Sequence, residues 1–125
     1  MKAEEEVEKT LIESPDLIAG SERKVLGFSN NISTTEAEIN EIEQWTMAKI
    51  ANELNQEGKK LYKNEAARNG ELSKELFKRK DYNEKKKEIN FMKNELAKEK
   101  IKLTYLQNRF SAAKYLTRLY SQSEE

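Results

Sequence analysis

The sequence predicts an all-α protein, an elongated helical hairpin or coiled coil that is oligomeric and has a long heptad helix near its C-terminal end. One Pro and four Gly in 125 residues, with abundant Glu, Lys, Leu and Ala, favour helix interiors over sheets. Charged residues make up 37% and hydrophobic residues 36%, which is too polar for a compact globule with a large core. Residues 82–120 also keep an apolar heptad repeat.

The first 35 residues are predicted to form an acidic N-terminal segment and a docking loop. Residues 2–13 could make one short acidic helix. Residues 14–35 contain the only Pro, two of the four Gly and a cluster of Ser, Asn and Thr, which is typical of loops. The same stretch carries Leu17, Val25 and Phe28, so we expect the loop to dock on the helices or on a partner.

Residues 36–120 are predicted to be the long helices of the hairpin or coiled coil, followed by a tail at 121–125. Two overlapping capping-box patterns, Ser33 with Glu36 and Thr35 with Glu38, predict where the first of these helices begins.

The turn between the long helices has two candidate positions. Gly70 costs a helix roughly 1 kcal/mol relative to Ala, as does Gly58, so a break near Gly70 is one alternative. The stretch "KRKDY" is preferred, because Asp81 can cap a new helix with Glu84 three residues later.

The heptad stripe of residues 82–120 predicts self-association. Glu88 would meet Lys93 of a parallel second copy, and such pairs help to set orientation. The pattern still leaves antiparallel pairing and the number of subunits open. The predicted oligomerisation residues are Ile89, Met92, Leu96, Leu103, Leu106, Phe110, Ala113 and Tyr120.

The last turns of this helix are apolar around much of their circumference. The residues outside the heptad stripe are Ile101, Tyr105, Ala112, Leu116 and Leu119. Such a helix end is expected to be covered by more than one neighbour. Aromatic residues at helical spacing favour packing. The alternative is that three tyrosines stack on bases beside three cations, namely Tyr105, Tyr115 and Tyr120 beside Arg109, Lys114 and Arg118.

The composition removes most catalytic chemistry. The absence of Cys and His excludes disulfides, thiol nucleophiles and imidazole catalysis, and no Gly-rich phosphate-binding loop is present. We therefore predict no enzyme activity, no metal and no cofactor. The acidic start has no apolar signal core, and no stretch approaches the roughly 18 to 20 apolar residues of a membrane span. These features predict a cytoplasmic protein without a membrane partner.

A net charge of zero conceals an acidic first half and a basic second half. Residues 1–57 carry 5 basic and 13 acidic residues, and residues 58–120 carry 18 basic and 8 acidic residues. Such asymmetry indicates either a polyanionic partner or halves that neutralise each other across a helix contact.

Basic clusters provide the predicted nucleic-acid-binding surface. If the chain turns at "KRKDY", two Lys-rich groups gather at one hairpin tip, where they could neutralise phosphates without reading bases. Phe77 and Tyr82 flank that tip and could stack on unpaired bases, whereas the alternative is a solvated tip that keeps the protein soluble. The predicted residues are Lys78, Arg79, Lys80, Lys85, Lys86 and Lys87, with Lys59, Lys60 and Lys63 as a second cluster.

The stretch "LYKNEAARNGELSKELFKRKDYNEKKKEINFMKNELAKEKIKLTYLQNRF" resembles small helical proteins encoded by bacteriophages near their recombination and replication genes. In general layout it is similar to recombination mediators of the UvsY type, over roughly residues 36–120. The resemblance implies binding to single-stranded DNA, a ring-like oligomer formed through the C-terminal region, and help in loading a recombinase in the host cytoplasm. No family motif aligns residue by residue, so no site residue is carried over.

Two functions follow as expectations. The first is a non-catalytic phage-type accessory protein that binds single-stranded nucleic acid and helps to assemble a recombination or replication complex. The second is a coiled-coil scaffold or inhibitor that captures another protein through its acidic first half and has no nucleic-acid role.

Overall fold

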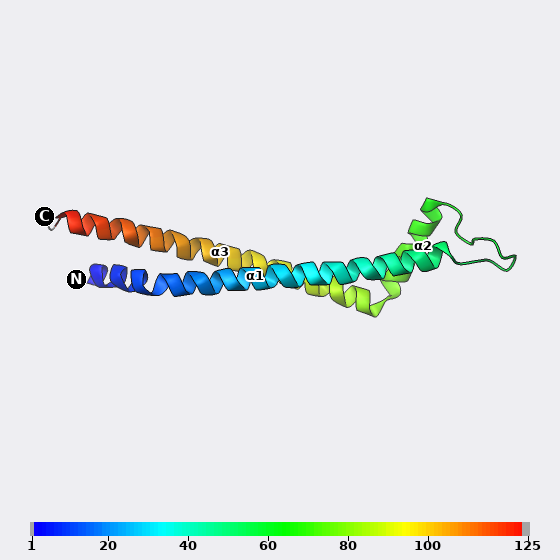
Figure 1. Cartoon of the computed structure of the whole chain (residues 1–125), viewed down its shortest axis with the longest axis horizontal. Coiled ribbons are helices and arrows are strands. Elements are labelled where there is room, and N and C mark those ends of the chain that lie inside the picture. Colours follow the sequence, from blue (N-terminus) through cyan, green and yellow to red (C-terminus); the bar gives the residue numbers. More distant parts are fainter. Residues whose placement is uncertain (1, 124–125) are drawn as a thin grey trace. The chain divides into compact units, whose positions relative to one another are not determined.

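The computed structural model describes residues 2–123, and within that range the chain forms three helices and no strand (Figure 1). They are α1 (Lys2–Ala51), α2 (Glu65–Lys78) and α3 (Lys80–Ser123). The predicted all-α class is confirmed. The chain divides into two compact units, a terminal unit of Met1–Ser29 with Lys93–Glu125 and a middle unit of Asn30–Met92.

The predicted loop at residues 14–35 is wrong, because α1 continues through it without a break. Residues that face inward recur along α1 at spacings of three and four. Several of these positions hold Ser or Thr, which interrupts the apolar pattern. Pro15 is exposed on the opposite side. The inward positions are Val7, Leu11, Ser14, Ile18, Ser21, Val25, Phe28, Ile32, Thr35, Ile39, Ile42 and Thr46.

The two capping boxes therefore do not begin a helix. Thr35 is 7% exposed and lies in the middle of α1. Two other buried hydroxyl groups of α1 are satisfied within the helix itself: Thr10 donates to the carbonyl of Glu6 at 2.9 Å, and Thr46 donates to that of Ile42 at 2.7 Å. Small hydroxyl side chains can thus occupy a packed helix face without leaving unpaired polar atoms.

In the terminal unit, the beginning of α1 and the end of α3 lie side by side and run in opposite directions (Figure 1). The Ser21 hydroxyl donates to Glu99 Oε1 at 2.8 Å. Nearer the ends of the helices, Thr10 and Leu106 line one groove, and Val7 and Tyr120 line another. The predicted heptad stripe of α3 thus packs within the chain.

In the middle unit, the last part of α1 packs against α2 and the first part of α3. The helices α1 and α3 are antiparallel here as well, since Glu38 pairs with Lys85 and Thr46 contacts Arg79. The core residues of this unit are Ile32, Ile39, Ile50, Leu76, Ile89 and Met92.

The first long helix was predicted to run from residue 36 to about residue 80, and this is also wrong, because α1 ends at Ala51. A loop follows in which Leu54 and Lys60 form an isolated antiparallel bridge. Gly58 has a φ of 78°, which only Gly adopts without strain. The helix α2 then begins after Asn64, whose side chain accepts the N–H of Ala67 at 2.7 Å as an N-cap.

A helix break does occur within the predicted "KRKDY" segment. It falls at Arg79, which has an extended conformation (φ −81°, ψ 116°), and Asp81 lies in the first turn of α3. Gly70 lies inside α2 and makes no break. The paired arms are α1 and α3, so the break is a corner between α2 and α3 instead of a tip between two long helices. Of the predicted tail, residues 121–123 continue α3, and 124–125 lie outside the described residues.

Candidate functional site

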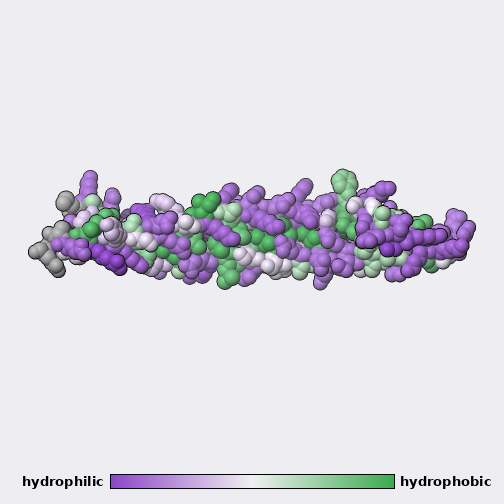
Figure 2. Space-filling model, turned by 90° about the horizontal axis from the view of Figure 1, so that it is seen from above, coloured by the Kyte–Doolittle hydropathy of each residue, from purple (hydrophilic) through white to green (hydrophobic). Residues whose placement is uncertain are grey.

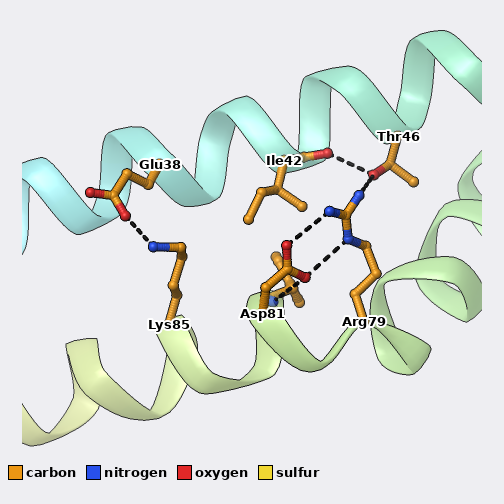
Figure 3. A network of polar contacts seen from close by, with 7 residues as sticks. Glu38, Ile42, Thr46, Arg79, Asp81 and Lys85 are labelled. Carbon is orange, nitrogen blue, oxygen red and sulfur yellow. Dashed lines mark hydrogen bonds and ion pairs between the residues drawn. The ribbon is translucent and has the colours of Figure 1, made fainter.

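The first candidate site is the junction cluster, defined as Lys78, Arg79, Lys80, Lys85, Lys86 and Lys87. The break at Arg79 brings the end of α2 and the first turns of α3 together. Arg79 and Lys85 hold close, partly buried contacts with carboxylates of the chain, Lys80 makes only a long and exposed contact with Glu84, and Lys78, Lys86 and Lys87 are exposed. Figure 3 shows the contacts of Arg79 and Lys85.

Arg79 ties the corner to α1. Its Nη2 lies 2.8 Å from Asp81 Oδ2 and its Nε lies 3.1 Å from Asp81 Oδ1, a bidentate pair (Figure 3). Its Nη1 donates to the hydroxyl of Thr46 at 3.4 Å. The Arg79 hydrogen bond lowers the pKa of Asp81 below its ordinary value of 3.8. Arg79 therefore has a structural role, which the nucleic-acid prediction did not anticipate.

Lys85 forms the second link, an ion pair with Glu38 of α1 (Figure 3). The hydrogen bond to Glu38 raises the pKa of Lys85. One turn earlier, the Tyr82 hydroxyl donates to Glu43 Oε1 at 3.0 Å. Burial first, and then this hydrogen bond, raise the pKa of Tyr82. Glu38 of α1 thus neutralises one cation of the junction cluster.

The remaining lysines of the cluster are exposed. The side chain of Lys80 is 90% exposed and lies 3.9 Å from Glu84, and Lys86 lies over the Tyr82 ring at 5.5 Å. Lys78 and Lys87 make no ion pair within residues 2–123. These four cations can neutralise phosphates of a bound strand.

Phe77, next to this cluster, is 81% exposed. Proteins that bind single-stranded nucleic acids combine such exposed rings, on which the bases stack, with Lys side chains that contact the phosphates. By contrast Tyr82, the other ring of the prediction, is turned toward Glu43.

Lys59, Lys60 and Lys63 lie on the loop before α2 and do not join the junction cluster. The 14 residues of α2 separate the loop from Arg79 by about 21 Å of helix, at about 1.5 Å per residue. The structure therefore keeps the two predicted cationic clusters as separate sites.

Trp45 is an exposed aromatic residue that the sequence prediction missed. It is 61% exposed, with Lys49 at 5.8 Å and Arg79 at 5.4 Å from its ring centre. A groove beside it is lined by Asn40, Glu41, Ile42, Gln44, Trp45 and Arg79. The signal available in the sequence was the only Trp of the chain, four residues before Lys49 in a polar stretch.

The predicted oligomerisation residues lie on the side of α3 that faces inward within each unit. Four of them are at most 8% exposed, namely Ile89, Met92, Leu106 and Ala113. The other four, Leu96, Leu103, Phe110 and Tyr120, are half-buried. Contact of the buried four with a second chain would require α1 to separate from α3, so their use between chains stays a prediction.

A second apolar row lies on the other side of α3. This outer stripe comprises Ile101, Tyr105, Asn108, Ala112, Tyr115 and Leu119, spaced alternately four and three residues apart. Its four large members are 72%, 60%, 62% and 41% exposed in chain order. Figure 2 shows how hydrophobic groups interrupt an otherwise mostly hydrophilic face of the molecule. The predicted apolar helix end is thus present, and α1 covers only one side of it.

Cations accompany the outer stripe. Between residues 100 and 122 there are five Lys or Arg and no Asp or Glu, and none of the five forms an ion pair within the described residues. Lys114 lies over the Phe110 ring at 4.3 Å. The five cations are Lys100, Lys102, Arg109, Lys114 and Arg118.

Two absences within residues 2–123 bear on the site. No group of three or more acidic residues is placed to hold a metal ion, and no helix has the length and apolar character needed to cross a membrane. Comparison with protein-family models, curated proteins and solved structures found no match to this chain.

Proposed function

We propose that the chain is a non-catalytic helical scaffold that binds another polypeptide along the outer stripe of α3, in coiled-coil fashion. The observation that carries this proposal is the exposure of 41–72% at four large apolar residues on one helix face, while α1 covers the opposite face. Contiguous exposed apolar residues of this kind are typical of protein interaction sites. Their alternate spacing of four and three residues fits a helical partner.

The size of the stripe indicates how strong such binding is. Each large apolar side chain contributes about 1.5 to 3 kcal/mol when it is fully buried. Association costs roughly 4 to 15 kcal/mol in lost freedom. Four side chains therefore give weak and reversible binding, unless further contacts beside the stripe add to it.

A photo-crosslinking amino acid at position 105, in cells that produce the protein, tests this function. Tyr105 lies in the outer stripe, and Lys24, exposed on α1 in the same unit, provides a matched control position. A discrete heavier adduct from position 105 and none from position 24 is expected. No adduct from position 105, or equal adducts from both positions, would overturn the proposal.

Single-stranded nucleic-acid binding is the second candidate, in the setting of a phage-type recombination or replication complex. It is favoured by the exposed Lys78, Lys80, Lys86 and Lys87 beside Phe77, which is 81% exposed. Binding there would be electrostatic and indifferent to sequence.

A titration with labelled oligothymidylate at two salt concentrations tests this second function. The logarithm of the affinity should fall by roughly 0.7 units per decade of salt for each phosphate contacted. Changing Lys78, Lys86 and Lys87 to Gln should reduce that slope, whereas Lys24→Gln, at an exposed position of α1, should not. Absence of binding even at low salt would remove this candidate.

A further inference from the structure

We infer that the partner of the outer stripe is an acidic amphipathic helix of another protein; this inference rests on the proposed scaffold function. The stripe is apolar apart from Asn108 and lies in a segment of α3 with five cations and no carboxylates. A partner with the opposite pattern, apolar along one face and lined by Glu or Asp, complements both features.

The cations stand at both edges of the stripe. Lys102 and Arg109 each follow a stripe residue by one position, so they project about 100° to one side of it. Arg118 precedes Leu119 by one position and projects to the other side. A helix docked on the stripe would thus meet Arg118 along one flank and Lys102 and Arg109 along the other. On the second flank, Arg109 also borders grooves lined by Glu6 and Glu13 of α1.

Ion pairs with these cations would add to the weak binding that the four large apolar side chains of the stripe give on their own. Each exposed ion pair contributes about 0.2 to 1 kcal/mol and is weakened by salt. Several such pairs add to the apolar contact and discriminate against basic helices, because like charges repel. Selectivity for acidic helices and sensitivity to salt are therefore expected together.

A second copy of the chain fits this surface less well. Antiparallel pairing of two outer stripes would match Ile101 with Leu119 and Tyr105 with Tyr115 across the contact. That register places Arg109 beside the Arg109 of the other copy. A parallel pair avoids this clash but still gathers ten cations without a carboxylate from either segment.

A nucleic-acid strand also fits less well. Tyr105 and Tyr115 offer rings for stacking, but Ile101, Ala112 and Leu119 occupy the positions between and beyond them. Aliphatic side chains do not provide the aromatic platforms that unpaired bases use. A row in which aliphatic and aromatic residues alternate, interrupted only by Asn108, favours a helix.

Binding of two synthetic peptides to the full chain tests the inference. Both peptides contain three heptads with Leu at the first and fourth positions; one has Glu at the flanking fifth and seventh positions, and the other has Lys there. Fluorescence anisotropy should show a dissociation constant at least about tenfold lower for the Glu peptide, equivalent to about 1.4 kcal/mol. Raising the salt concentration should bring the dissociation constants of the two peptides closer together, because salt screens the charges.

Charge-reversal variants test whether the cations beside the stripe select the peptide. The pair K102E and R109E should reverse the preference toward the Lys peptide, whereas the control pair R23E and K24E, exposed on α1, should leave it unchanged. Y105S with L119S should weaken binding of the Glu peptide. Because these positions are exposed, helicity measured by circular dichroism should stay the same in all variants.

Several outcomes would overturn the inference. Equal binding of the two peptides, or no reversal in the K102E and R109E variant, would exclude an acidic helix. So would a stable dimer of the chain in sedimentation that the same reversal disrupts, or oligothymidylate displacing the Glu peptide from the stripe. If crosslinks at position 105 persist when the peptides bind equally, the scaffold function stands and only the acidic partner falls.

Discussion

Gly27 and Gly58 differ in backbone conformation, because Gly27 is helical and Gly58 has a positive φ. Gly27 lies inside α1, and a Cβ built there meets nothing within 4 Å, whereas Gly58 lies in the loop at φ 78°. Gly27→Ala should raise the free energy of unfolding by about 1 kcal/mol, because Ala loses less backbone entropy in a helix. Gly58→Ala should lower it by about 1 to 2 kcal/mol, because a Cβ is strained in the left-handed region. Urea denaturation followed by circular dichroism measures both.

Each Gly variant is the control for the other, because both add one methyl group and differ only in the backbone conformation of the site. If Gly27→Ala lowered the stability, α1 would not be a helix at that position in solution.

The pair of Arg79 and Asp81 predicts a dependence of stability on acid. The hydrogen bond to Arg79 lowers the pKa of Asp81 in the folded chain, so the pair stabilises the fold above the ordinary pKa of 3.8. That contribution is lost as the pH falls through the lowered folded pKa. Thermal unfolding between neutral pH and about pH 2 should therefore show a smaller acid-dependent loss in Asp81→Asn than in the wild type.

The control for this titration is Asp16→Asn, at an exposed position of α1. An equal change in the acid profile of both variants would show that the pair at the corner contributes nothing specific.

At the scale of the elements, replacing Pro15 tests whether α1 is helical at that position. The sign of the change in the free energy of unfolding distinguishes a helix from a loop. Pro inside a helix lacks an N–H for the carbonyl four residues earlier, here Leu11, and costs about 3 kcal/mol relative to Ala. Pro15→Ala should therefore raise the free energy of unfolding by up to about 3 kcal/mol. In a loop, the same change would lower it slightly by freeing the unfolded chain. Equilibrium urea unfolding distinguishes the two.

The sequence predicted α3 well and α1 poorly, for one physical reason. Leu, Ile and Phe on the inward side of α3 stand out from its polar residues, so the heptad pattern is visible. On α1 the inward side includes the buried Ser14, Ser21 and Thr35, and the Ser21 hydroxyl donates across the contact to Glu99 of α3. Tertiary packing there overrides the loop propensity of Pro and Gly, and single-residue propensities do not contain that information.

The candidate sites were likewise visible only in part. The sequence identified the cations of the junction cluster, but the contacts of Lys85 with Glu38 and of Arg79 with Thr46 depend on which turn of α1 lies opposite. The sequence shows the outer stripe as excess apolar residues, but its exposure depends on α1 covering the other side of α3. Trp45 carried no pattern that distinguishes an exposed ring from a packed one.

For the whole molecule, the charge asymmetry belongs largely to the paired helices. The helix α1 carries 11 acidic and 5 basic residues, and α3 carries 5 acidic and 11 basic residues. Opposite net charges therefore face each other in the terminal unit and in the middle unit. The pairing thus brings opposite charges together within the chain, and the ion pair of Lys85 with Glu38 joins the two helices directly.

This pairing predicts that salt destabilises the protein. Packed helix axes lie about 8 to 10 Å apart, and the screening length falls from about 10 Å at 0.1 M to about 3 Å at 1 M salt. The attraction between α1 and α3 should thus be mostly lost at 1 M sodium chloride, which should lower the thermal unfolding midpoint by a few degrees, equivalent to roughly 1 kcal/mol. Replacing Glu38 and Glu43 with Gln removes two acidic contacts of α1 and should reduce this salt effect. A midpoint that stays constant or rises with sodium chloride in the wild type would mean that the opposite charges of the helices do not hold them together.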